Sequence, residues 1–280
     1  MTEIGVFARV FPPGPPDAVA SAIAAAGFTV AQLNLSALGR PTLDETLTAW
    51  DAAAIGAAFR EAGVSVWGVS GTFNAIHPDP VVRRAGMRGC QAVIEWASAI
   101  GAGVVTLSTG TRDPDDTWRG HPDNGSAEAW RDLRETLDVL IPAAAAAGVR
   151  LGVEPELGNV VRDAEAADRL LTELGADARH IAIVLDPANL LTVETLPRQE
   201  AILTRAFELL GSRTGAVHAK DVVAEGYAAP GAGGMDYGLV TRLMLDLPPA
   251  VPIIAQDLRS DDAVRVREFL EGHLRASEAR

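Results

Sequence analysis

The sequence contains a single cysteine, Cys90, in 280 residues, so the fold cannot depend on an internal disulfide bond. Cys90 lies in a helical pattern without a neighbouring histidine, and we expect a packed structural thiol rather than a nucleophile. No apolar run approaches the roughly 20 residues that span a bilayer. The first residues also lack the basic segment of a signal peptide. We therefore expect a cytoplasmic protein that has no membrane partner.

Basic residues are scarce as well. The chain has 24 Lys and Arg against 37 Asp and Glu, and its formal net charge is -13. Nucleic-acid binding usually requires a basic face, so this balance argues against a nucleic-acid partner. The glycine fingerprint of dinucleotide binding is also missing, because Phe11, Pro12 and Pro13 follow the first expected strand.

What the sequence does contain is a repeated alternation of strand-like and helical segments. Eight short apolar segments have the composition of buried strands, and a segment with apolar residues at three- and four-residue spacing follows each one. Glycines typical of helix C-termini precede several of these strands. Eight evenly spaced units predict one domain over residues 1–280, a closed (β/α)8 TIM barrel rather than a doubly wound open sheet. The expected strands are 4–9, 28–35, 64–70, 104–109, 149–154, 180–186, 215–218 and 252–256, and the expected helices are 17–26, 43–62, 80–100, 127–147, 164–174, 198–210, 237–245 and 261–276.

The last four expected strands each end on a side chain that can hold a divalent metal. These residues are Glu154, Asp186, His218 and Gln256, at spacings of 32, 32 and 38 residues. Each spacing leaves room for one returning helix, so the four side chains should meet at the carboxyl-end mouth of a parallel barrel. Any one of them alone is better explained as a turn residue or a buried imidazole. Four together at matching strand ends indicate a site.

The donor atoms of this set indicate the kind of metal. Glu154 and Asp186 offer carboxylate oxygens and His218 an imidazole nitrogen, a set suited to Mn²⁺, Mg²⁺ or Co²⁺ rather than to a thiolate-held zinc. Gln256 would add an amide oxygen, which is a weaker ligand because it is neutral. We expect Mn²⁺ first, with Mg²⁺ and Co²⁺ as alternatives.

Several motifs along the chain resemble the sugar phosphate isomerase/epimerase family of the xylose isomerase-like TIM-barrel superfamily, which includes tagatose/psicose 3-epimerases and endonuclease IV. The order and spacing of these motifs are more specific than any one of them, and they extend over almost the whole chain. The matching stretches are Ser70–Asp79, Gly110–Arg112, Glu154–Glu156, Leu185–Leu191, Val217–Asp221 and Gly231–Tyr237.

This resemblance implies a metal at Glu154, Asp186 and His218, and a glutamate at position 256. In the epimerases, two metal-bound glutamates exchange a proton with the substrate through an enediolate. Glu154 and Gln256 therefore occupy the two catalytic positions, but Gln256 cannot accept a proton. Asp257 is adjacent, and on a continuing strand it should point away from the interior. The resemblance thus implies a metal-dependent isomerase or epimerase acting on a sugar or sugar-derived ketone, with one carboxylate base.

Other polar residues near the strand ends are candidates for binding a small carbohydrate substrate. Lys220 should share its side of the strand with His218 and could meet an oxyanion, and Trp118 could wall a sugar pocket. Each also has a simpler explanation, as a loop cap or a solvated rim residue. The substrate-binding candidates are Asn74, His77, Glu156, Asn189, Lys220 and Arg259.

Three alternatives remain open. A lyase that eliminates a group next to a carbonyl also needs only one base. A barrel with a degenerate metal site could serve as a binding module or a partner-dependent subunit, for which Gln256 is the motivation. An endonuclease IV-like repair enzyme ranks lower, because its trinuclear zinc site needs many ligands and the chain has only five histidines. Barrels of this superfamily often form homo-oligomers, but no apolar stripe in the sequence marks an interface.

Overall fold

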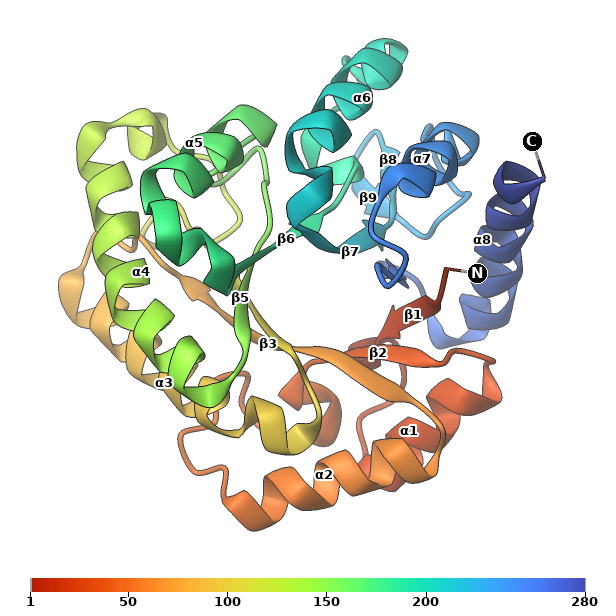
Figure 1. Ribbon diagram of the computed structural model, residues 1–280, viewed down its shortest axis with the longest axis horizontal. Coiled ribbons are helices and arrows are strands. Elements are labelled where there is room, and N and C mark those ends of the chain that lie inside the picture. Colours follow the sequence, from red (N-terminus) through yellow and green to blue (C-terminus); the bar gives the residue numbers. More distant parts are fainter. Residues whose placement is uncertain (1, 280) are drawn as a thin grey trace.

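The computed structural model of the protein describes residues 2–279 and contains a closed barrel of eight parallel strands. The strands neighbour one another in the order β1-β10-β7-β6-β5-β4-β3-β2, and the helices surround the ring (Figure 1). This arrangement confirms the expected (β/α)8 TIM barrel. The barrel strands are β1 (Ile4–Phe7), β2 (Val30–Leu33), β3 (Ser65–Asn74), β4 (Val104–Ser108), β5 (Arg150–Val153), β6 (Ile181–Leu185), β7 (Thr214–Ala219) and β10 (Ile253–Ala255).

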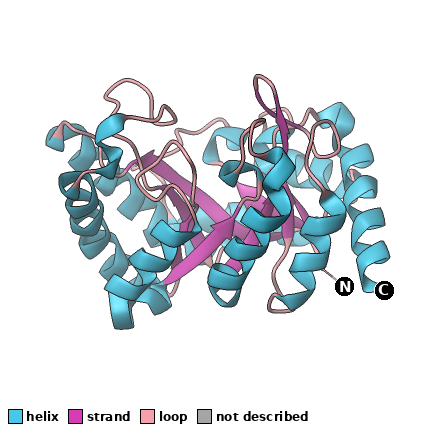
Figure 2. Ribbon diagram, turned by 90° about the horizontal axis from the view of Figure 1, so that it is seen from above, coloured by secondary structure: helices cyan, strands magenta, loops and turns pink. Residues whose placement is uncertain are grey.

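In the described part of the chain, eight α-helices cover the outside of the barrel, and Figure 2 shows helices flanking the strands from a second direction. The last helix, α8, packs against β1, so the final element contacts the first. Within residues 2–279, none of the helices combines the length and the apolar character needed to cross a membrane. The helices are α1 (Pro16–Ala25), α2 (Ala49–Glu61), α3 (Pro80–Ile100), α4 (Ala127–Ala147), α5 (Ala164–Leu174), α6 (Gln199–Leu210), α7 (Tyr237–Leu243) and α8 (Ala263–Glu278).

Local signals set the ends of these helices. The expected start of the second helix at Leu43 was too early, because Thr48 begins α2 with a capping box. The Thr48 hydroxyl accepts from the Asp51 amide at 3.2 Å, and the Asp51 carboxylate accepts from the Thr48 amide at 3.1 Å. The glycines expected at helix ends have the left-handed conformation that favours them, as Gly63 and Gly101 show with φ of 74° and 99°.

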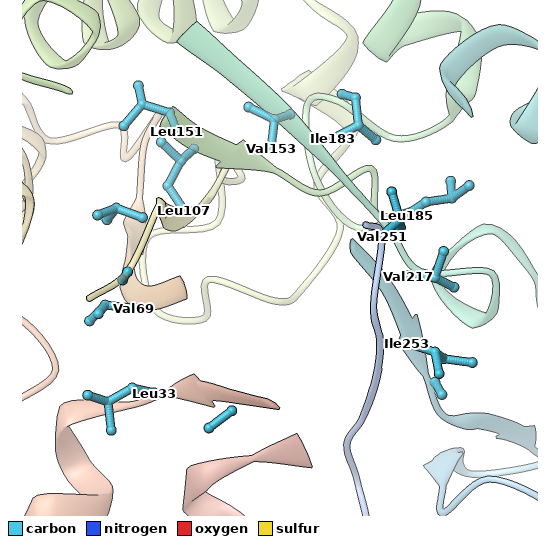
Figure 3. Packing of buried hydrophobic residues seen from close by; sticks show 14 of the residues in the cluster. Leu33, Val69, Leu107, Leu151, Val153, Ile183, Leu185, Val217, Val251 and Ile253 are labelled. Atoms are coloured by element: carbon cyan, nitrogen blue, oxygen red, sulfur yellow. The ribbon is translucent and has the colours of Figure 1, made fainter. Parts of the chain in front are cut away.

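Side chains along each barrel strand alternate between the barrel interior and the surrounding helices. Leu151 and Val153 of β5 point outward and pack in the main hydrophobic core. The residues between and after them point into the barrel, and Glu154 is the next residue on that inward side. The same alternation turns Asp186 and His218 inward after β6 and within β7. Figure 3 shows the core side chains, among them Leu33, Val69, Leu107, Leu151, Val153, Ile183, Leu185, Val217, Val251 and Ile253. A smaller apolar cluster of Phe7, Ala216 and Ile254 lies apart from this core.

Cys90 is fully buried in α3, and burial raises the pKa of its thiol to about 12. This agrees with the packed, unreactive thiol expected from the sequence.

An ion-pair network ties the loops that follow β3 and β4 to the helices. Asp132 of α4 contacts Arg83 of α3 and Arg112 of the β4 loop, each at 2.7 Å. Both guanidinium groups also donate to backbone carbonyls of the β3 loop, those of His77 and Ile76. The shared carboxylate is largely buried, so it fixes the position of two loops at the mouth of the barrel.

The segment after β7 is more ordered than the sequence indicated. It forms an antiparallel hairpin of β8 (Asp221–Val223) and β9 (Gly226–Ala228), followed by the glycine-rich stretch 230–234. Asp221 is fully buried and accepts hydrogen bonds from the amides of Met235 at 2.8 Å and Gly231 at 3.0 Å. One carboxylate therefore anchors the glycine-rich stretch at both of its ends.

Candidate active site

Glu154, Asp186 and His218 converge at the carboxyl-end mouth of the barrel, as the strand spacing predicted. One ligand atom from each lies within 4.8 Å of the others. Asp186 and His218 are buried, whereas Glu154 is half-buried. The three follow or lie within neighbouring strands, β5, β6 and β7. At each of these positions the alternation of side chains along the strand turns the side chain into the barrel, so the three meet.

The hydrogen bonding of His218 tests whether these residues fit a divalent metal. Its Nε2 lies 2.8 Å from Gln32 Oε1, which can only accept, so Nε2 carries a proton. The other ring nitrogen, Nδ1, lies 3.2 Å from Glu154 Oε1, and without a proton of its own it would face that oxygen as a second acceptor. Two acceptors at this distance require a proton or a cation between them. The donor set, two carboxylates and an oriented imidazole, therefore fits a divalent metal.

Gln256 and Lys220 also reach this centre. Gln256 is buried, and its Nε2 donates to Asp186 Oδ2 at 2.6 Å. The Lys220 ammonium lies 3.3 Å from the same oxygen and 3.7 Å from the centre of the Tyr227 ring. Asp186 Oδ1 accepts from the Ala188 amide at 2.9 Å. Both oxygens of this buried carboxylate thus have hydrogen-bond partners.

The carboxyl groups of the site differ in their affinity for protons. Burial alone would raise the pKa of Glu154, but the nearby His218 and Lys220 outweigh it and lower this pKa. Burial and the Glu154 charge raise the pKa of Glu156 to about 8. Burial also raises the pKa of Asp186, and Lys220 offsets this only in part. The nearby carboxylates outweigh burial and raise the pKa of Lys220, which is therefore a cation at neutral pH.

Glu154, Glu156 and Lys220 border a cavity of about 300 Å³ that is rich in polar side chains, whereas Asp186 and His218 lie behind its lining. On its β2–β4 side, Asn34 donates to Ser70 at 2.9 Å, while Gln32 lies 3.4 Å from both Ser70 and Thr106. The lining residues are Phe7, Arg9, Gln32, Asn34, Ser70, Thr72, Thr106, Leu107, Ser108, Trp118, Glu154, Glu156, Asn189, Lys220, Tyr227, Gln256 and Asp257.

Two buried amide oxygens in this cavity, Asn34 Oδ1 and Asn189 Oδ1, have no hydrogen-bond partner among the described residues. Asn189 uses its other amide atom to donate to Glu154 at 2.7 Å. Trp118 and Tyr227 line the same cavity, and these residues are 56% and 39% exposed. The two amide oxygens are closed off from solvent, whereas the aromatic rings offer a surface on which a sugar ring could pack.

Three of the expected substrate-binding residues do not line the cavity. Asn74 is buried and bridges two loops, exchanging hydrogen bonds with the backbone of Thr111 at 2.8 and 3.0 Å. His77 accepts from the Asp79 amide at 3.0 Å in the loop before α3. Arg259 is exposed, just before the short 3-10 helix at residues 260–262. Glu156, Asn189 and Lys220, in contrast, all line the cavity.

Part of the site does not follow from strand alternation and the sequence motifs. Asp257 was expected to point away from the interior, yet it lines the cavity, because its φ of 54° interrupts the alternation that follows β10. Gln32 and Asn34 were missed too. Their signal was present, since they are the polar residues at alternate positions in the otherwise apolar run Val30–Leu35.

Comparisons with known proteins agree with this architecture. A family model described as xylose isomerase-like TIM barrel matches residues 20–262. The structure of 3-keto-D-glucoside 4-epimerase YcjR from E. coli has 18% sequence identity and a TM-score of 0.74, covering 99% of this chain and 100% of that one. A D-psicose 3-epimerase from Clostridium cellulolyticum H10, solved with D-tagatose, has 14% identity and a TM-score of 0.74, covering 98% and 99%. No curated protein matches the chain by sequence.

Proposed function

The chain belongs to the xylose isomerase-like TIM-barrel family, and we propose that it is a divalent-metal-dependent isomerase or epimerase of a sugar or sugar-derived ketone. One observation carries this proposal. Glu154, Asp186 and His218 bring their ligand atoms within 4.8 Å of one another, beside a cavity lined with hydroxyl and amide groups. The structural neighbours, which act on keto-glucosides and ketohexoses, add support for a carbohydrate substrate.

Glu154, Asp186 and His218 would hold the metal, and we propose Mn²⁺, with Mg²⁺ and Co²⁺ as alternatives. When bound, such a metal polarises a substrate carbonyl and stabilises the negative charge that develops on its oxygen. Gln32 orients the imidazole for this role, since it accepts from the far ring nitrogen at 2.8 Å.

Side chains of the chain itself would bind the substrate and move its proton. Glu154 is the proposed base, because it lines the cavity and its lowered pKa keeps it ionised and able to accept a proton. It removes a proton from the carbon next to the carbonyl, which leaves an enediolate. Lys220, a buried cation beside the cavity, is placed to stabilise an oxyanion. Asn189 and Glu156 would contact substrate hydroxyl groups.

Gln256 limits what this machinery can do. Its amide cannot accept a proton, so the two-base pair of the resembled epimerases is incomplete at this position. Isomerisation between an aldose and a ketose needs only one base on one face of the substrate. Elimination of a group next to a carbonyl has the same requirement, and this lyase activity is the second candidate that Gln256 favours.

Metal binding and proton exchange together test the proposal. Protein stripped with EDTA is titrated calorimetrically with Mn²⁺, and ketohexoses (D-fructose, D-psicose and D-tagatose) are incubated in D₂O with Mg²⁺-loaded protein and followed by NMR. We expect one metal per chain and metal-dependent deuterium incorporation next to the carbonyl. Asp186→Asn should weaken metal binding about 100-fold, whereas Asp177→Asn, at an exposed position, should not. Protein that neither binds metal nor exchanges any sugar proton would contradict the proposal.

A further inference from the structure

Asp257 has an unusual backbone conformation. Among residues 2–279 it is the only residue other than glycine with a positive φ, at 54°. Residues with a Cβ atom adopt this left-handed conformation at an energetic cost, although aspartate tolerates it better than most. Such strain persists where the surrounding structure holds it in place, and it concentrates at functional sites.

The left-handed turn changes the direction of this side chain. Gln256 already occupies the inward position after β10, so a continuing strand would aim Asp257 toward the helices. Instead both residues line the same cavity. The Asp257 side chain is 35% exposed, and its carboxylate lies 4.0 Å from the Lys220 ammonium. Among the described residues, Lys220 is closer to Asp186, at 3.3 Å. Lys220 therefore has a nearer counter-ion and does not need Asp257 for charge compensation.

Asp257 and Glu154 approach the cavity from different walls. In the closed barrel, β6 and β7 separate β5, which carries Glu154, from β10, which precedes Asp257. Both carboxylates border the same space of about 300 Å³. Inversion at a carbon atom requires one acid–base group on each face of that carbon, and carboxylates carried by strands on separate walls of one cavity are the arrangement from which such a pair can be built.

We propose that Asp257 is the second acid–base residue of the site and supplies the carboxylate that Gln256 lacks. This inference rests on the proposed function. Glu154 takes the proton as the carbon–hydrogen bond breaks. That electron pair forms the carbon–carbon double bond of the enediolate, and the carbonyl π pair moves onto oxygen. Asp257 in its acid form then donates a proton to the opposite face, and the electrons return to the carbonyl. The carbon is inverted, no co-reactant is consumed, and exchange with water resets both carboxyl groups.

The test compares Asp257→Asn with wild type and with Asp261→Asn, a matched change at an exposed position outside the cavity. Mg²⁺-loaded protein is incubated in D₂O with D-fructose, D-psicose or D-tagatose, and NMR follows both epimerisation and deuterium incorporation. We expect Asp257→Asn to lose epimerisation at least about 100-fold. It should still exchange the proton of the epimer that faces Glu154, while Asp261→Asn behaves as wild type. Wild-type epimerisation by Asp257→Asn, or equal loss of exchange from both epimers with intact metal binding, would overturn the inference.

A stability measurement tests the strain on which the inference draws, even where no tested sugar reacts. Asp257→Gly removes the strain and the carboxylate together. If Asp257 is held in a strained conformation for catalysis, the metal-free variant should melt about 2 °C higher than wild type. A lower melting temperature would assign Asp257 a structural role and overturn the inference. Wild-type protein that exchanges no sugar proton would instead count against the proposed function, so the two failures are distinguishable.

Discussion

Replacement of Gln256 by glutamate perturbs the centre of the site directly. Gln256 Nε2 donates to Asp186 Oδ2 at 2.6 Å, and both side chains are buried. A hydrogen bond to a charged group contributes about 1.5–3 kcal/mol. An ionised glutamate cannot donate this bond, and it places a second carboxylate beside Asp186. Like charges at such a distance in a buried site are strongly unfavourable.

In metal-free protein we therefore expect Gln256→Glu to lower the free energy of unfolding by about 3 kcal/mol. For a chain of this size, that corresponds to a fall in melting temperature of about 6–12 °C. A divalent cation should reverse the effect, because it compensates both carboxylates. Differential scanning calorimetry in EDTA and in saturating MnCl₂ measures the two states, and we expect Mn²⁺ to raise the melting temperature of the variant more than that of wild type.

Gln91→Glu is the matched control, since it makes the same chemical change on α3, away from the residues that line the cavity. It should change the stability by less than about 0.5 kcal/mol, with or without Mn²⁺. Metal-free Gln256→Glu that melts with wild type would refute the stabilising contact to Asp186. A variant that gains no more than wild type from Mn²⁺ would show that position 256 is not beside the metal site.

Three further changes test other parts of the account. Gln32→Leu removes the acceptor of the His218 imidazole, so Mn²⁺ affinity measured by calorimetric titration should fall about 10–100-fold; unchanged affinity would contradict this orienting role. Burial raises the pKa of Cys90 to about 12, so its thiol should resist Ellman's reagent at about pH 8 in the folded protein and react fully in guanidinium. Rapid labelling of the folded protein would contradict the burial of this thiol. Asp132→Ala should cost about 3–5 kcal/mol in urea unfolding, because two guanidinium groups lose a buried partner. The exposed Glu135→Ala should cost less than about 0.5 kcal/mol, and similar effects for both would argue against the network.

The sequence predicts the barrel and the centre of its site well, because both follow from simple periodicities. Glu154, Asp186 and His218 each end an apolar strand in the inward phase, and one helix separates each from the next. Strand alternation and barrel closure then bring the three together without any information on distant contacts. Helix ends were predicted within a few residues wherever a glycine or a proline marked them.

The remainder of the site depends on contacts that the sequence does not reveal. Asp257 enters the cavity through a left-handed turn, and nothing in its neighbours signals this break in the alternation. Gln32 gains its role only because barrel closure places it 2.8 Å from His218, which is 186 residues away in the chain. Asn74 resembles a substrate-binding residue in the motif, yet its amide is fully used in joining two loops. Polar residues near a strand end can be proposed from the sequence, but their partners cannot.

The central claim is that Glu154, Asp186 and His218 hold one divalent metal at the mouth of the barrel. A crystal structure of protein grown with MnCl₂, with diffraction data collected for the anomalous signal of manganese, tests it most directly. The account predicts a single anomalous peak bonded to all three side chains at about 2.0–2.3 Å. The claim would be contradicted if no anomalous peak appeared at the mouth of the barrel and the Lys220 ammonium and the Gln256 amide still contacted Asp186.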